Sequence, residues 1–241
     1  MATASSRAKA TRQTSPSAVT ANGAPKDVQV SGTKLSKLVD VNGGASGPRS
    51  KRSAIIDTAV ARFGETGYEL TKWSTIADEV GIGQTALYHY FESKAHCLLT
   101  IMRLELARSY QRFLTSAHER EGHREAIEHA LIAAFDVTPT EVSQLRILMA
   151  HGDLLANPRP SEREEAERKV CLELTRLIEQ AWTDLLGHKL TAEQDHRDPR
   201  MLARAVLGLI NSVWRWYRLG GRLALKDVSK FYVESALLIV G

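Results

Sequence analysis

The sequence predicts an all-α protein with two structured parts. Apolar residues recur at helical spacing from about residue 52 to the end of the chain, and no stretch alternates as a half-buried β-strand does. The 241 residues suffice for a small domain joined to a larger one. We therefore divide the chain into a tail over residues 1–48, a three-helix unit over 49–95 and a larger helical region over 96–241.

The tail is rich in Ser, Thr, Ala, Gly and Lys and has no aromatic residue. It cannot bury enough apolar surface to order itself, so we expect it to be disordered. Its basic residues favour the role of a flexible arm on a nucleic-acid backbone. An acid-poor start that contains Arg and Ser also resembles an organelle transit peptide, and composition leaves that alternative open.

The first helix is expected to begin near Ser50 or Arg52 and to end at Gly64 and Gly67, after a short apolar stripe. That stripe consists of Ile55, Ile56, Ala59, Val60 and Phe63. A connector over Tyr68–Thr71 leads to a second helix at about Ser74–Val80, with Ser74 as its N-cap. Gly81 suits a left-handed turn into a third helix at about Gln84–Phe91.

The third helix presents side chains suited to the major groove of duplex DNA. Leu87 belongs to the interior, so Thr85, Tyr88 and His89 point away from it, flanked by Gln84 and Ala86. An amide pairs with adenine, a hydroxyl serves base or phosphate, and a methyl meets thymine, while Tyr88 and His89 suit phosphates. As an alternative, Gln84 and Thr85 only cap the helix.

Charge is distributed unevenly around this unit. Residues 1–52 hold nine Lys and Arg against two acids, whereas residues 53–96 hold three against six. We therefore expect Arg49, Lys51 and Arg52 to supply much of the attraction to phosphate. Lys94 is either a backbone contact or a solvated lysine, whereas Tyr90 and Phe91 are expected to pack inside.

Residues Arg52–Leu99 resemble the DNA-binding domain of the TetR family of bacterial regulators. The motifs that carry the resemblance are Phe63-Gly64-Glu65-Thr66-Gly67-Tyr68, Thr75–Ile82, Leu87-Tyr88-His89-Tyr90-Phe91 and Ser93-Lys94. The resemblance implies that Thr75 and Lys94 hold phosphates, that Gln84, Thr85 and Ala86 face bases, and that Tyr88 and His89 touch the backbone. The long tail departs from the family, whose members usually begin close to the first helix.

Six further helices are expected after the three-helix unit, and Pro139 and Pro199 sit where first-turn prolines are tolerated. Their expected bounds are Lys94–His118, His123–Phe135, Pro139–Leu155, Ser161–Leu186, Pro199–Leu219 and Lys226–Val240. The fifth of them carries two neighbouring apolar stripes, one starting at Leu202 and one at Ala203, which we expect to face its own core and a partner at once. With the last helix it predicts a four-helix interface in a homodimer, and a monomeric core is the alternative.

The TetR resemblance also implies a small-molecule pocket in the C-terminal region. The segment Leu209–Arg222 resembles members that sense acyl-CoA or steroid-degradation thioesters, although Leu219 stands where a proline is common. A bulky hydrophobic effector such as a CoA thioester follows from this resemblance. The residues expected to contact it are Arg146, Met149, Trp182, Asn211, Trp214 and Arg215. The alternative is that the tryptophans are core or interface residues and the arginines are solvated.

Other function classes lack a signature in the sequence. Cys97 and Cys171 form neither a disulfide framework nor a zinc site, the histidines have no zinc spacing, and no catalytic motif is present. We expect no catalytic residue, metal or cofactor, no membrane span, and a cytoplasmic location. The leading hypothesis is a ligand-responsive repressor that binds a palindromic operator. The alternatives are an activator, or an enzyme or small-molecule carrier with a vestigial DNA motif.

Overall fold

The computed structural model describes residues 51–118, 122–187 and 197–241, and its regular elements there are all helices. They are α2 (Lys51–Glu65), α3 (Trp73–Val80), α4 (Gln84–Tyr90), α5 (Lys94–His118), α6 (His123–Ala133), α7 (Pro139–Ala150), α8 (Asp153–Ala156), α9 (Glu162–Gly187), α10 (Pro199–Trp216) and α11 (Leu225–Val240). The expected all-α class is confirmed. Arg49 and the expected tail lie outside the described residues.

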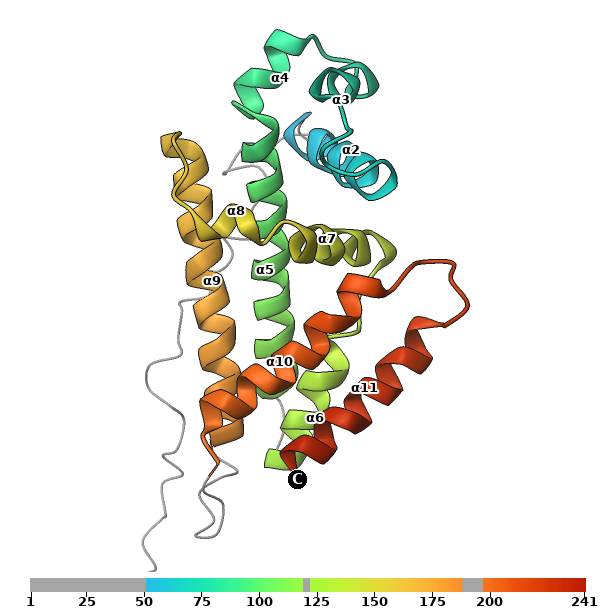
Figure 1. Ribbon diagram of the computed structural model, residues 1–241, viewed down its shortest axis with the longest axis vertical. Helices are drawn as coiled ribbons and strands as arrows, with labels where there is room; N and C mark the ends of the chain where they lie inside the picture. Colours follow the sequence, from blue (N-terminus) through green and yellow to red (C-terminus); the bar gives the residue numbers. More distant parts are fainter. Residues whose placement is uncertain (1–50, 119–121, 188–196) are drawn as a thin grey trace, which may run out of the picture.

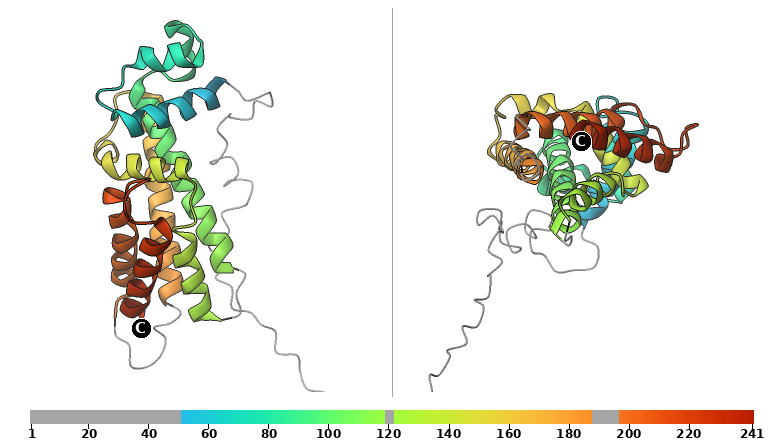
Figure 2. Two further views of the ribbon diagram at one scale, coloured as in Figure 1. Left: turned by 90° about the vertical axis from the view of Figure 1, so that its right-hand side faces the viewer. Right: turned by 90° about the horizontal axis from the view of Figure 1, so that it is seen from below.

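The molecule is elongated, with α2, α3 and α4 at one end and α6, α10 and α11 toward the other (Figure 1). The long helix α5 leaves the first group and runs down the molecule with α9 beside it, and α7 crosses between α2 and α10. Figure 2 shows the same division from the side. None of the described helices is long and apolar enough to cross a membrane.

Two clusters of buried side chains hold these helices together. The lower cluster joins α6, α10 and α11 with the C-terminal halves of α5 and α9 and the N-terminal half of α7. The upper cluster contains Ile55, Ile76, Leu87 and Phe91, and it continues without a break into Leu98 and Ile101 of α5, Ile147 and Leu148 of α7, and Cys171 of α9. The three-helix unit therefore rests on a core that it shares with the body.

Local sequence explains some of the helix ends. Gly81 adopts the expected left-handed conformation, with φ of 67°. The expectation that Ser74 caps α3 is wrong: α3 begins at Trp73 behind Lys72, and no side chain bonds its first turn. By contrast, Thr138 caps α7 in a reciprocal capping box with Glu141, directly before Pro139.

The single helix expected over Pro139–Leu155 is broken in two. The chain leaves the helical conformation at His151 and restarts after Gly152 as the short α8. The His151 ring packs edge-on against Tyr68, with ring centroids 5.1 Å apart. The carbonyl oxygen of Leu155 accepts a hydrogen bond from Arg168. These contacts come from distant parts of the chain, so periodicity alone did not reveal the break. Helix α10 likewise ends at Trp216, earlier than expected.

The apolar stripes of α10 serve its own core more than was expected. Leu202, Val206, Val213 and Trp214 are buried, and α10 contacts α7, α9 and α11. Its outer side exposes Met201 and Trp216 as well as arginines and the small Ala205 and Gly208. Further exposed apolar surface lies on α11, where Phe231 is 66% and Leu238 84% exposed. Most of both stripes of α10 therefore packs within the chain, Trp216 at the end of the first stripe is exposed, and the expected contact with a partner stays a prediction.

Candidate functional site

The outer face of α4 carries the side chains that the sequence assigns to DNA. Gln84, Thr85, Tyr88 and His89 are exposed, while Leu87 is fully buried below them. Ala86 is half-buried at the edge of this face. The helix has only seven residues, so its orientation depends on Leu87 and on the segments at its two ends. This geometry offers amide, hydroxyl and imidazole groups to a groove.

A hollow lies between the start of α3 and the end of α4, which we call the α3–α4 hollow. Lys72, Ser74 and Tyr88 line it together with Trp73, Lys94 and two acidic residues, Glu69 and Glu92. The indole Nε1–H of Trp73 is buried without an acceptor among the described residues. The hydroxyl and ammonium donors of the lining are of the kind that hold phosphate oxygens, whereas the two carboxylates act against an anion. Thr75, which the family resemblance assigns to phosphate, is half-buried on α3 and does not line the hollow.

Lys94 uses its ammonium group within the protein. Nζ donates hydrogen bonds to the carbonyl oxygens of Tyr68, at 2.7 Å, and Thr71, at 3.1 Å, and it lies 4.2 Å from the centre of the Tyr68 ring. Burial raises the pKa of the Tyr68 hydroxyl to about 12. Lys94 therefore holds the connector that leads into α3, and its contact with phosphate remains a prediction.

Two further basic residues from the predicted DNA set also reach inward. Arg52 donates to the carbonyl oxygen of Tyr90 at 2.8 Å, and its guanidinium carbon lies 4.2 Å from the centre of the Phe91 ring. Burial lowers the pKa of Arg52. Lys51 is exposed, and its Nζ lies 3.2 Å from the carbonyl oxygen of Val80. Arg52 therefore links α2 to the end of α4, and Lys51 links α2 to the end of α3.

The body contains a cavity of about 460 Å³ enclosed by α5, α6, α7, α9 and α10. Four of the six expected ligand residues line it, namely Met149, Trp182, Asn211 and Trp214, whereas Arg146 and Arg215 do not. The walls are mainly apolar, with Phe113, Leu145 and Ile210 beside the tryptophans. Such a chamber suits a hydrophobic small molecule.

The cavity opens between α9 and α10, where its lining residues Thr175, Arg204 and Gly208 are exposed. Here the carboxylate of Glu179 accepts hydrogen bonds from Arg200, at 2.6 Å, and Arg204, at 3.2 Å. The bond from Arg200 lowers the pKa of Glu179. Two guanidinium groups thus share one carboxylate, and the mouth keeps a surplus of positive charge.

The opposite wall carries a buried polar cluster that the sequence analysis missed. Arg112 of α5 lines the cavity and bonds to Glu105 and Glu141, both at 2.9 Å, while Arg108 bonds to Glu105 and Gln144. Burial raises the pKa of the fully buried Glu105. The signal was present, because Glu105, Ser109 and Arg112 recur at helical spacing and so share one face of α5.

In the described part of the chain, no group of three or more His, Cys, Asp or Glu residues could hold a metal ion. Cys97 and Cys171 are buried free thiols, and burial raises the pKa of both.

Two family models match this chain. Residues 55–101 match the model described as bacterial regulatory proteins of the tetR family, and residues 146–240 match the tetracyclin repressor-like C-terminal domain. The HTH-type transcriptional repressor KstR2 of Mycobacterium tuberculosis H37Rv is 27% identical over 196 residues, covering 78% of this chain and 92% of the relative. KstR2 of Rhodococcus jostii is also 27% identical, covering 80% and 92%.

Solved structures share the fold. The ketosteroid regulator KstR2 of M. tuberculosis superimposes with a TM-score of 0.65 at 24% identity, covering 80% of this chain and 96% of that chain. AibR, solved in complex with isovaleryl coenzyme A and operator DNA, gives a TM-score of 0.59 at 19% identity, covering 77% and 97%.

Proposed function

Since the chain belongs to the TetR family of ligand-responsive transcriptional regulators, we propose that it is a repressor that binds a palindromic operator as a homodimer and is released by a hydrophobic effector. The observation that carries this proposal is the presence in one chain of an exposed polar face on α4 and an apolar cavity in the body. As a repressor of chromosomal genes, the protein would work in the cytoplasm.

On DNA, α4 is proposed to lie in the major groove. Gln84, Thr85 and Ala86 would meet base edges, while Tyr88 and His89 would contact phosphates. Thr75, Lys94, Lys51 and Arg52 would add backbone contacts at the rim of the reading unit, and Arg49 would do so from the segment before α2. The α3–α4 hollow supports a phosphate position close to Tyr88.

The homodimer is proposed to form through α10 and α11. Phe231 and Leu238 stand on one face of α11, seven residues apart, and both are largely exposed in the single chain. Ala205 and Gly208 on the outer side of α10 would let a partner helix approach closely. A two-fold axis here gives two copies of α4, which matches an operator with two half-sites.

The effector is proposed to be a CoA thioester of lipid or steroid catabolism. The apolar walls around Trp182 and Trp214 suit an acyl or ring system, and the positive surplus at Arg200 and Arg204 suits the phosphates of coenzyme A. The likeness to KstR2 and AibR supports this class of effector. KstR2 is described as a ketosteroid transcriptional regulator, and AibR was solved in complex with isovaleryl coenzyme A. Binding would favour a dimer whose α4 pair no longer fits the operator.

The test is selection of duplexes from a random library, followed by affinity measurements with and without thioesters. We expect one palindromic sequence to be enriched and a hydrophobic acyl-CoA to weaken its binding. Gln84→Ala should cost about 1–3 kcal/mol of discrimination at one base pair and little elsewhere. No enrichment at physiological salt would contradict the proposal, tighter operator binding with the thioester would favour an activator, and turnover of the thioester would favour an enzyme.

A further inference from the structure

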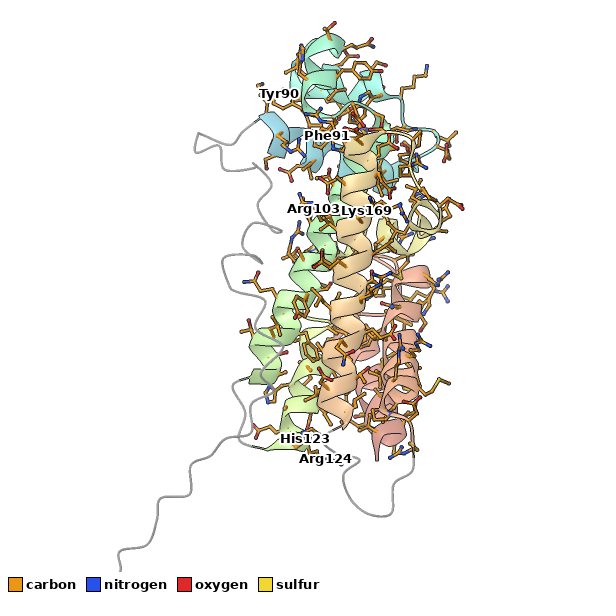
Figure 3. All side chains as sticks on the ribbon, turned by 90° about the vertical axis from the view of Figure 1, so that its left-hand side faces the viewer. Tyr90, Phe91, Arg103, His123, Arg124 and Lys169 are labelled. Atoms are coloured by element: carbon orange, nitrogen blue, oxygen red, sulfur yellow. The ribbon has the colours of Figure 1, made fainter. Side chains whose placement is uncertain are left out.

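The two longest described helices, α5 and α9, begin side by side at the end of the molecule that carries α4. Figure 3 shows α9 running along α5, with Arg103 and Lys169 at a similar level and Tyr90 and Phe91 above them. Nε of Arg103 lies 2.6 Å from a carboxylate oxygen of Glu167, which joins the two helices at this level. Because both helices point the same way, the positive ends of their dipoles lie close together.

Each of these helix starts is capped by a serine that also bonds to the other helix start. Ser93 Oγ accepts the backbone N–H of His96, at 2.9 Å, and donates its own proton to Glu164 Oε1, at 2.5 Å. Ser161 Oγ accepts the backbone N–H of Glu164, at 3.3 Å, and donates its proton to the carboxylate of Glu92. We call the pair of bonds Ser93–Glu164 and Ser161–Glu92 the crossed cap.

The crossed cap is held in one geometry by its surroundings. Glu164 is 6% exposed, and its second oxygen accepts a hydrogen bond from Nε of Arg159 at 2.9 Å. A buried carboxylate that lost its donors would carry a large desolvation cost. One turn further along, Glu167 also accepts a hydrogen bond from Thr100 at 3.1 Å. The starts of α5 and α9 are therefore expected to move together.

The crossed cap connects the reading helix with the cavity. Glu92 and Ser93 follow α4 directly, after the buried Phe91, so their position fixes the end of that short helix. At the other side, α9 continues without a break from Glu162 to Gly187 and lines the cavity with Ile178 and Trp182. A second route exists through α7, whose Ser143 lies against Gly64 of α2.

We propose that the crossed cap sets the angle of α4 and is the joint through which occupancy of the cavity reaches that helix by way of α9. Ser93, Glu164, Ser161 and Glu92 are positioning residues in this scheme, since they act through α4. The inference rests on the proposed function, because it takes α4 as the reading helix and the cavity as the effector site.

The first test replaces each serine by aspartate in the full chain. Asp is as good an N-cap as Ser, so the cap of α5 or α9 is retained, but a carboxylate has no proton to donate to Glu164 or Glu92 and repels it. In Ser161→Asp and Ser93→Asp we expect the backbone amides of α4 to exchange with deuterium roughly five- to tenfold faster than in the wild type. Peptides of α10 and α11 should not change.

A rescue experiment separates positioning from a simple loss of stability. In Ser161→Asp combined with Glu92→Gln, the Gln amide donates to the Asp carboxylate, so the bond re-forms with donor and acceptor exchanged. Ser93→Asp combined with Glu164→Gln does the same for the other bond. We expect both pairs to restore slow exchange in α4. The matched control is Glu162→Gln, an exposed site in the same first turn of α9. Wild-type exchange in the Asp variants, or no rescue, would overturn the proposal.

The second test measures transmission with 6-propionyl-2-(dimethylamino)naphthalene, an apolar fluorophore whose binding is followed by energy transfer from Trp182 and Trp214. Saturation of the cavity should change exchange in α4 at least about twofold in the wild type and in Glu162→Gln, and should leave Ser161→Asp unchanged. If saturation of the cavity still changed exchange in α4 of Ser161→Asp, the signal would travel through α7 and α2 and not through the crossed cap. If the bound probe left exchange in wild-type α4 unchanged, the cavity would not be coupled to α4 and this part of the proposal would be wrong. DNA selection on the wild type is independent of these measurements, so failure of the repressor function is recognised separately.

Discussion

The reading unit, residues 51–93, and the helical body, residues 94–241, use charged and apolar side chains in opposite ways. In the reading unit, Arg52 turns inward to a backbone carbonyl, the exposed Lys51 reaches one at the surface, and α4 presents the amide, hydroxyl and ring groups of Gln84, Thr85, Tyr88 and His89. In the body, charged clusters line a cavity, and apolar side chains on α11 remain at the surface. The difference indicates that the first part is built to select, whereas the second is built to enclose a ligand and to pair with a second copy.

The largest effect is expected at the exposed face of α11. Phe231→Asp should convert the dimer to a monomer. A symmetric interface buries Phe231 of both protomers, so the substitution removes about 3–6 kcal/mol from the free energy of dimerisation. Sedimentation velocity across a concentration series measures this change. Leu70→Asp is the matched control, because Leu70 is 80% exposed but lies in the reading unit. If both variants dissociated, or neither did, the pairing role of α11 would be wrong.

A slightly smaller effect is expected from substitutions that destabilise the upper and the lower cluster separately. Leu87→Ala should destabilise the reading unit by about 2–5 kcal/mol, because Leu87 is fully buried in the upper cluster. Leu131→Ala makes the same change in the lower cluster. Hydrogen exchange resolved to peptides should show each loss mainly in its own cluster. Equal loosening of both parts in both variants would mean that the shared helix α5 makes the molecule a single cooperative unit.

The next effect is a loss of stability expected at Arg52. Arg52→Met keeps the contact with the Phe91 ring but removes the charge above it and the hydrogen bond to Tyr90, so we expect a loss of about 1–2 kcal/mol in the free energy of unfolding. Lys51→Met serves as the control, since Lys51 is exposed and should change stability by less than about 0.5 kcal/mol. Urea unfolding of both variants measures the difference. Equal losses would show that burial does not distinguish the two residues.

The smallest effect is expected in how the free energy of unfolding falls at acidic pH. Burial acts to raise the pKa of Glu141, but hydrogen bonds from Thr138 and the charge of Arg112 lower it on balance. Glu141 therefore stabilises the fold above its unfolded pKa, and this contribution is lost as pH falls through the folded value. Glu141→Gln should make unfolding free energy fall less steeply between about pH 5 and pH 3. Glu128→Gln, at an exposed site, should keep the wild-type slope.

Much of the fold was predictable because it depends on local patterns. The repeat of Ile55, Ala59 and Phe63 predicted α2, and Gly81 predicted the turn before α4. Leu87 alone fixed which side chains of α4 face outward. The break at His151 was not predictable, because its ring packs against Tyr68, more than eighty residues earlier in the chain.

The candidate sites were predictable only in part. Trp182, Asn211 and Trp214 were expected at a ligand and do line the cavity, whereas Arg146 and Arg215 lie elsewhere. The cluster of Arg108 and Arg112 around the buried Glu105 on α5 was missed, because a charged residue on a helix usually indicates a solvated face.

The sequence by itself determined the helical class, the order of the helices, the outward face of α4 and the family. Those features follow from periodicity, glycine conformation and short motifs, all of which act over a few residues. Only the tertiary structure decided that Lys94 and Arg52 reach backbone carbonyls, that α10 packs against α7, α9 and α11, and that Ser93 and Ser161 bond across two helix starts. Such partners are separated by some 25 to 70 positions in the sequence, so only packing brings them within hydrogen-bonding distance.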